Sequence, residues 1–253
     1  MKTLAVIPAR LGATRLPRKP LRLLAGVALV VRVWERVVAM RVADRCVIAT
    51  DAEEVARVAR EAGAEVVMTR ADHPSGTDRV AEVAEMVAYR TYEILVNVQG
   101  DEPFVSPDAI RGACDLTRDG HFPLATAAAS ADAGILELPN VVKVVVGERG
   151  RALYFSRAPV PFLRDMADRE TRDLNVYQHI GVYSYTRDAL RRWVSLPPHA
   201  LERIERLEQL RPLAAGLAMG VAVIADSPGP GIDTEGDLVR ANERWDDFAA
   251  GRG

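Results

Sequence analysis

The chain has 253 residues, of which 49% are hydrophobic, so it can bury a substantial core in one large domain or two small ones. A formal net charge of −2 gives no overall basic footprint for nucleic acid. No apolar run reaches membrane-spanning length, Pro8 interrupts the first strand too early for a secretory signal, and two widely spaced cysteines favour a reducing cytoplasm.

Short apolar segments alternate with helical patterns through the first part of the chain. The predicted strands cover residues 4–7, 45–50, 65–68 and 92–98. The predicted helices cover residues 28–40, 51–63 and 78–88. Because strand and helix alternate, the pattern predicts an α/β fold with a doubly wound, mostly parallel sheet.

The middle of the chain departs from this rhythm and predicts a central β excursion near residues 140–185. Strands over 141–146 and 152–155 flank Gly147–Gly150, a spacing typical of a hairpin. An exposed loop is expected over 159–172 and a further strand over 176–185. Helices over 187–194, 201–215 and 234–248, with a strand over 221–225, then return to the core. We expect a single α/β domain over residues 1–253.

The run Val96-Asn97-Val98-Gln99-Gly100-Asp101-Glu102-Pro103 ends a buried strand on a glycine, two carboxylates and a proline. Such a strand presents Asp101 at the sheet edge, where open α/β folds bind ligands. Mg²⁺ prefers oxygen ligands of this kind. Taken alone, the run is better interpreted as a strand-end turn in which Asp101 bonds nearby amides. Asp233, before the final helix, is predicted as a helix N-cap or as a second metal ligand beside Asp101.

Two further segments could contact a nucleotide. The loop after the first strand carries Arg10, Arg15, Arg18 and Lys19, which favours phosphate binding over a merely solvated loop. It has neither a Walker motif nor a dinucleotide fingerprint, which argues against an NAD-linked oxidoreductase. Ser75-Gly76-Thr77 precedes a helix, where capping is the better interpretation and a base or phosphate contact the alternative.

Polar residues of the second half support structural interpretations first. A lone strand histidine such as His179 is more often structural than catalytic. Glu202, Glu205 and Glu208 recur at helical spacing, which is typical of a solvated face paired with arginines. No zinc spacing and no nucleophile elbow occur in the sequence.

Taken in order, the motifs resemble the 3-deoxy-manno-octulosonate cytidylyltransferase (CMP-Kdo synthetase) family. The resemblance runs from about residue 4 to about residue 240. The matching segments are Ile7-Pro8-Ala9-Arg10, Thr14-Arg15-Leu16-Pro17, Lys19-Pro20-Leu21, Ala49-Thr50-Asp51, Ser75–Arg79, Asn97–Pro103, Ala152–Arg157, His179–Tyr183 and Leu207–Arg211.

The resemblance implies a nucleotide-diphospho-sugar transferase fold of the glycosyltransferase-A-like type. The implied reaction moves CMP from CTP to the anomeric hydroxyl of 3-deoxy-manno-octulosonate (Kdo), releases pyrophosphate, requires Mg²⁺ and serves lipopolysaccharide-type glycan synthesis. The resemblance also implies a homodimer through the β excursion, which contributes to the sugar site, and no nucleic-acid partner or membrane insertion.

The resemblance assigns roles to individual residues. The implied nucleotide contacts are Ala9, Arg10, Arg15, Lys19, Ser75, Gly76, Gln99 and Asp101. The implied metal ligands are Asp101 and Asp233, and the implied catalytic set is Arg15, Lys19, Asp101 and Asp233. The implied sugar contacts are Arg157, His179, Tyr183, Glu208 and Gln209. This replaces the structural interpretation of His179 and Glu208, but not that of Glu202 or Glu205.

The chain departs from the family pattern at three places. Arg18 stands where the first loop usually has glycine, Thr234-Glu235-Gly236 lacks the usual proline, and Gln178 precedes His179 where arginine is common. Transfer to a different or amino-substituted sugar acid therefore stays open as an alternative. A non-catalytic nucleotide-binding protein is the other alternative, and the presence of both Asp101 and Asp233 argues against it.

Overall fold

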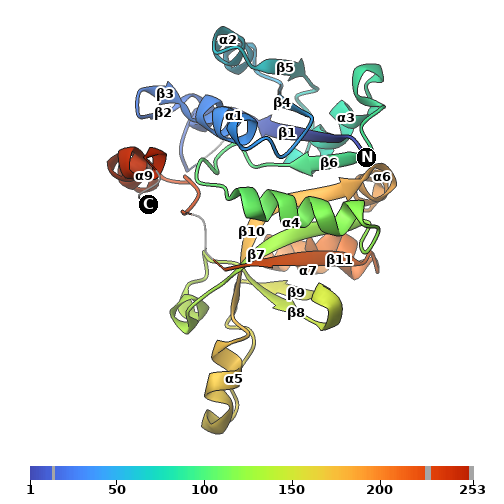
Figure 1. Ribbon diagram of the computed structural model, residues 1–253, viewed down its shortest axis with the longest axis vertical. Helices are drawn as coiled ribbons and strands as arrows, with labels where there is room; N and C mark the ends of the chain where they lie inside the picture. Colours follow the sequence, from blue (N-terminus) through green and yellow to red (C-terminus); the bar gives the residue numbers. More distant parts are fainter. Residues whose placement is uncertain (13–14, 226–228, 251–253) are drawn as a thin grey trace. The chain divides into compact units, whose positions relative to one another are not determined.

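Strands and helices alternate from residue 3 to residue 97 in the computed structural model of this protein, which describes residues 1–12, 15–225 and 229–250 (Figure 1). The backbone forms two compact units. The N-terminal unit comprises residues 2–107 and 229–250, and the central unit comprises residues 108–225. The expectation of one domain over residues 1–253 stays a prediction.

The main sheet of the N-terminal unit is parallel, as predicted, whereas β2 (Leu23–Leu24) and β3 (Val27–Ala28) form a separate antiparallel pair. The strands of the main sheet are β1 (Thr3–Ala9), β4 (Arg45–Thr50), β5 (Glu65–Met68) and β6 (Ile94–Asn97). β4 and β6 pair with opposite edges of β1, and β5 pairs with β4. The chain thus moves outward from β1 and then returns to its other side. Such a reversal leaves a crevice outside the carboxyl ends of the two strands, where open α/β folds bind ligands.

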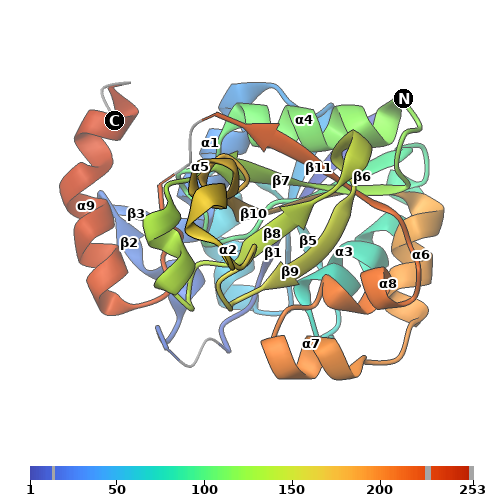
Figure 2. The same cartoon turned by 90° about the horizontal axis from the view of Figure 1, so that it is seen from below.

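Helices connect these strands and a late helix completes the unit. α1 (Leu29–Met40), α2 (Glu53–Glu61) and α3 (Gly76–Glu85) lie in the three crossovers, the last followed by η2 (Val87–Tyr89). The predicted helix over 78–88 therefore ends early, at Glu85. Between β1 and α1 lie η1 (Lys19–Leu21), β2 and β3. Figure 2 shows α9 (Glu235–Ala249) beside β2 and β3.

The central unit has a mixed sheet. β7 (Leu124–Ser130) pairs in parallel with β11 (Met219–Ile224) and antiparallel with β10 (Tyr177–Thr186). β8 (Lys143–Val146) and β9 (Ala152–Ser156) form the predicted hairpin, joined by η4 (Glu148–Gly150), and β8 also touches β10. The remaining helices are α4 (Pro107–Arg118), η3 (Ala133–Glu137), η5 (Met166–Asp168), α5 (Arg169–Asp173), α6 (Arg187–Ser195), α7 (Ala200–Glu205) and α8 (Leu210–Ala214).

Two predictions for the central unit are wrong. The single helix over 201–215 is interrupted, because Arg206 adopts a left-handed conformation with φ of 55° and closes α7 by donating its N–H to the Glu202 carbonyl. Figure 2 shows α7 and α8 as two separate helices side by side. The loop expected over 159–172 contains η5 and most of α5. Within the described ranges, no helix combines the length and apolar character needed to cross a membrane.

Candidate active site

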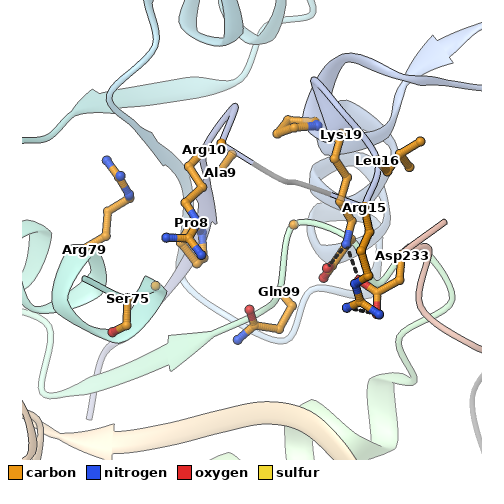
Figure 3. A pocket seen from close by; sticks show the side chains of 15 residues that line it. Pro8, Ala9, Arg10, Arg15, Leu16, Lys19, Ser75, Arg79, Gln99 and Asp233 are labelled. Atoms are coloured by element: carbon orange, nitrogen blue, oxygen red, sulfur yellow. Dashed lines mark hydrogen bonds and ion pairs between the residues drawn. The ribbon is translucent and has the colours of Figure 1, made fainter. Parts of the chain in front are cut away.

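A cavity of about 430 Å³ opens at the carboxyl ends of β1 and β6, within the N-terminal unit (Figure 3). This volume is in the range of small-molecule sites. Its walls come from the loop after β1, the start of α3, the turn after β6 and Asp233, which precedes α9. The structure brings together here all the residues predicted for nucleotide and metal: Ala9, Arg10, Arg15, Lys19, Ser75, Gly76, Gln99, Asp101 and Asp233.

Glycines allow the walls of this cavity to approach one another closely. A Cβ on Gly76 would lie 3.2 Å from the Pro8 ring, and a Cβ on Gly100 would lie 2.8 Å from the Pro8 carbonyl oxygen. The start of α3 and the turn after β6 therefore both press against the end of β1. A side chain at Gly100 would push the turn, and Asp101 with it, away from the cavity.

Asp101 and Asp233 converge through a backbone contact between distant segments. The N–H of Ile232 donates to the carbonyl oxygen of Asp101 at 2.9 Å, which fixes the residue next to Asp233. Ile232 is also buried in a cluster with Leu16, Phe104 and other apolar residues, against which Trp245 and Phe248 of α9 pack. Burial of this cluster holds the first loop and the segment before α9 in place.

The Lys19 ammonium lies between the two carboxylates. Its Nζ donates to Asp233 Oδ1 at 2.8 Å and to Asp101 Oδ2, and Arg15 adds a second contact to Asp233 at 2.9 Å. Figure 3 shows Lys19 and Arg15 both pointing toward Asp233. Burial by itself lowers the pKa of Lys19, but the two carboxylates outweigh burial and raise that pKa above its usual value.

The same two carboxylates fit a hard divalent cation. They reach a single cationic atom together, and both supply the oxygen donors that Mg²⁺ prefers. In residues 1–12, 15–225 and 229–250, no group of three or more histidine, cysteine or acidic side chains is arranged as a metal cage. Mg²⁺ in nucleotide enzymes commonly needs only one or two carboxylates, because substrate phosphates complete its shell.

Glu102 follows Asp101 in the chain. Its burial, and then the negative charge of Asp101, raise the pKa of Glu102 to about 8.

The opposite end of the cavity carries a residue for which we predicted no role. Arg79 lines the cavity beside Ser75 and Gln99, and only 2% of this residue is exposed. Its Nη2 lies 3.0 Å from Asp51 Oδ1, and its Nη1 donates to the Thr69 hydroxyl. The motif Ser75–Arg79 was the available signal, but a buried arginine is not visible in a helical pattern.

The two capping predictions have different outcomes. Ser75 caps α3, as predicted, by accepting from the Asp78 N–H at 3.2 Å. Asp233 is not an N-cap, because Thr234 caps α9 and forms a capping box with Asp237. Asp237 also accepts the Asp233 N–H at 3.1 Å, so this box replaces the missing proline in ordering the helix start. The Asp233 carboxylate is thereby left for Lys19 and Arg15.

Arg18 occupies a backbone conformation that suits glycine. Its φ is 57° and its ψ is 30°, in the left-handed region, where a side chain costs roughly 1–2 kcal/mol. The guanidinium pairs with Glu54 at the start of α2. This pairing gives the substituted side chain a partner outside the cavity. Ala13 and Thr14 of the same loop lie outside the described residues.

The predicted sugar residues all belong to the central unit, where His179 is packed among aromatic rings. The His179 ring lies 5.0 Å from that of Phe155 and 5.5 Å from that of Tyr183. Burial lowers the pKa of His179 to about 3, so the ring is neutral at physiological pH. The Thr126 hydroxyl donates to the Val182 carbonyl at 2.7 Å, which leaves its oxygen to accept from His179 Nε2 at 3.0 Å.

Glu208 and Gln209 lie between α7 and α8, whereas Tyr183 belongs to β10. Burial, Tyr185 and Glu208 raise the pKa of Tyr183 above its usual range, which places the Glu208 carboxylate within electrostatic reach of the phenol. Gln209 is buried at the start of α8.

The solvated interpretation of Glu202 and Glu205 is wrong. Glu202 does pair with Arg211, through two hydrogen bonds of 2.8 and 2.6 Å, but their side chains are only 15% and 7% exposed. Glu205 accepts from the Ser156 hydroxyl at 2.7 Å and from the Arg157 N–H at 2.9 Å. Both side chains belong to α7, and the left-handed turn at Arg206 that ends this helix separates them from Glu208.

Comparisons with known proteins find cytidylyltransferases by sequence and by structure. The cytidylyltransferase family profile matches residues 4–219. The 3-deoxy-manno-octulosonate cytidylyltransferase of Gemmatimonas aurantiaca is 60% identical over 246 residues, which are 97% of this chain and 95% of that protein. A solved structure of CMP:2-keto-3-deoxy-manno-octonic acid synthetase complexed with CTP has a TM-score of 0.90 and 36% identity, covering 98% of this chain and 100% of that one.

A more distant structure shares the fold. The inositol-1-phosphate CTP transferase from T. maritima has a TM-score of 0.68 at 16% identity, covering 99% of this chain and 97% of that one. The expected α/β fold with a mostly parallel sheet is therefore confirmed, both by the strand pairing and by these structures.

Proposed function

Since the chain belongs to the 3-deoxy-manno-octulosonate cytidylyltransferase family, we propose that it transfers CMP from CTP to the anomeric hydroxyl of Kdo and releases pyrophosphate. The activated sugar would supply lipopolysaccharide-type glycan synthesis. The observation that supports this most directly is Lys19, which holds Asp101 and Asp233 together in a cavity that also carries Arg10 and Arg15.

The cavity of the N-terminal unit is proposed to bind CTP. Its lining residues include four cations (Arg10, Arg15, Lys19 and Arg79) and two carboxylates (Asp101 and Asp233), a balance that favours a polyanion. The triphosphate would lie toward Arg10, Arg15 and Lys19, and the nucleoside toward Ala9, Ser75, Gly76 and Gln99. The start of α3 adds the backbone N–H groups of a helix N-terminus, which suit an anion.

Asp101 and Asp233 are proposed to hold Mg²⁺. When bound, the ion would neutralise phosphate oxygens and favour departure of pyrophosphate. Removing either carboxylate would leave the chain without the paired oxygens that meet at one point. This role is compatible with Lys19, because the flexible ammonium can turn from the carboxylates to a phosphate.

The chain's own cations address the main barrier to the reaction. A sugar hydroxyl oxygen must bond the α-phosphorus while the bond to the bridging oxygen of the β-phosphate breaks and the hydroxyl proton leaves to solvent. Both substrates are anions, so they repel each other, and charge accumulates on the leaving group. Arg15 and Lys19 offset that charge by electrostatic stabilisation.

The central unit is proposed to bind the sugar acid. Arg157 would pair with its carboxylate, while His179, Tyr183, Glu208 and Gln209 would contact its hydroxyl groups. The neutral state of His179 supports a hydrogen-bonding role over proton transfer. Because the family's ordered motifs are spread over both units, we propose that residues 1–253 act as one nucleotidyltransferase domain.

We also propose a cytoplasmic homodimer that forms through residues 140–185. Leu153, Phe162, Met166 and Leu174 of this segment are each more than half exposed, and the proposed interface would cover them. Light scattering coupled to gel filtration tests the assembly. The expected mass is twice 27.6 kDa, and Phe162→Asp with Leu174→Asp should reduce it to that of one chain.

The activity is tested by measuring pyrophosphate release with CTP and Kdo in the presence of Mg²⁺. UTP and ATP replace CTP in parallel reactions, and an amino-substituted Kdo replaces the sugar. Asp101→Asn should abolish release, whereas Asp188→Asn, whose side chain is 93% exposed, should not change it. Faster release with the amino sugar would favour the first alternative. Nucleotide binding without any release would favour a non-catalytic protein.

A further inference from the structure

A buried lysine marks the point in the central unit where β9 ends. Lys143 is 0% exposed, and its Nζ donates to the carbonyl oxygens of Leu138 at 3.0 Å, Val141 at 2.8 Å and Arg157 at 2.7 Å. Three acceptors satisfy the ammonium fully. Burial and then Arg157 lower the pKa of Lys143. The lysine therefore ties the segment before β8 to the residue that follows β9.

Glu205 holds Arg157 from a second direction. Its Oε2 accepts the Arg157 backbone N–H at 2.9 Å, and its Oε1 accepts the hydroxyl of buried Ser156 at 2.7 Å. Its own carbonyl oxygen accepts from Arg157 Nε at 2.9 Å. Glu205, at the end of α7, thus bonds the main chain of Arg157 through its carboxylate and the side chain of Arg157 through its backbone carbonyl.

These contacts leave one end of the guanidinium open. Nε and one proton of Nη1 are used, because Nη1 donates to the Pro139 carbonyl at 3.0 Å. The described residues supply no hydrogen-bond acceptor to Nη2. The remaining Nη1 and Nη2 protons form a planar fork of the kind that binds a carboxylate through two parallel bonds.

We infer that Glu205 is a positioning residue for the sugar acid, which fixes Arg157 so that its Nη1–Nη2 fork meets the sugar carboxylate. This inference rests on the proposed function. It extends the sugar site to a residue that touches no substrate and acts only through Arg157. A misplaced charged fork weakens both binding and orientation, and errors of about 1 Å can cost on the order of 10²-fold in rate.

The test is steady-state kinetics on Glu205→Ala and Glu205→Gln with Kdo and CTP varied separately. Glu205→Ala should raise the KM for Kdo by roughly 10-fold or more and leave the KM for CTP within about twofold. Glu205→Gln should recover part of this loss, because an amide oxygen still accepts one of the two hydrogen bonds. If the alanine variant does not fold, the glutamine variant alone carries the comparison between the two KM values.

Glu202→Gln is the matched control, since Glu202 lies on the same helix but pairs with Arg211. It should lower the unfolding temperature without separating the two KM values. A double-mutant cycle then asks whether Glu205 acts through Arg157. In an Arg157→Met background, Glu205→Ala should change the KM for Kdo no further.

The possible failures are distinguishable. A wild-type protein that is inactive with CTP and Kdo would overturn the proposed function and this inference with it. If the wild type is active, any one of three results would overturn the inference and leave the proposed function standing. These are an equal rise of both KM values in Glu205→Ala, a lower unfolding temperature with an unchanged KM for Kdo, or additive effects in the double-mutant cycle.

Discussion

Replacing Lys19 by methionine removes the cation between Asp101 and Asp233 while keeping most of the side-chain volume. In the native structure, Lys19 Nζ bonds both carboxylates, and its side chain is only 12% exposed. Without it, two negative charges face each other at a distance set by their former common partner. We therefore expect Lys19→Met to be destabilised in buffer containing EDTA, and to regain stability when Mg²⁺ is added.

The magnitude follows from charge and exposure. At an effective dielectric constant of about 20, two unit charges about 4 Å apart interact by about 4 kcal/mol, so losing the ammonium converts attraction into repulsion of that order. Asp101 and Asp233 are 33% and 47% exposed, so water offsets much of it. We expect a net loss of about 2 kcal/mol, between the values for exposed and buried pairs. For a chain of this size, that lowers Tm by roughly 4–8 °C.

The assay is thermal unfolding with and without Mg²⁺. At about 100 times its dissociation constant, a ligand that binds only the folded state adds about 2.7 kcal/mol, enough to restore the variant. Arg18→Met is the control, because it removes one positive charge from the same loop but breaks only an exposed pair with Glu54. It should change stability by less than about 1 kcal/mol and show no added response to Mg²⁺.

Two results would refute this reasoning. One is a Lys19→Met protein as stable as the wild type in EDTA, which would mean that the ammonium does not compensate the carboxylates. The other is a destabilised variant that Mg²⁺ does not stabilise more than the wild type. In that case the oxygens of Asp101 and Asp233 would not serve a common ion.

Three further predictions concern charge and pH. Asp233→Asn should raise the activation free energy by several kcal/mol, which lowers turnover on the order of 10³-fold, while the circular dichroism spectrum stays normal. Near-normal turnover would show that Asp233 is not part of the metal site. Arg157→Lys should raise the KM for Kdo far more than that for CTP, because an ammonium lacks the planar fork; equal changes would place Arg157 outside the sugar site. Because the pKa of His179 is depressed to about 3, the unfolded chain binds a proton between about pH 6.5 and pH 3 that the folded chain does not bind. The free energy of unfolding should therefore be highest above about pH 6.5 and should fall as the pH drops toward 3. His179→Gln should make denaturant-measured stability less dependent on pH in that window, and an unchanged slope would contradict a buried neutral ring.

Local patterns predicted the four parallel strands of the N-terminal unit and the helices between them well, because each of these strands is an apolar run and each of these helices has one apolar face. The central unit was harder. No strand was predicted at β7, whose sequence Leu124-Ala125-Thr126-Ala127-Ala128-Ala129-Ser130 is rich in alanine. Alanine has a low strand propensity, and this segment becomes a strand because it is paired on both sides, with β10 and β11. The neighbouring helix α4 also went without a prediction.

The order of motifs in the sequence alone identified the family and predicted nine of the 15 residues that line the cavity. Tertiary structure decided how those residues meet. The Ile232–Asp101 hydrogen bond brings Asp233 to Asp101, Asp51 fixes Arg79, and Glu205 at the end of α7 accepts the Arg157 N–H. The physical reason is range: apolar periodicity and turn residues act over a few neighbours along the chain, whereas these contacts join segments that become neighbours only after the sheets have formed.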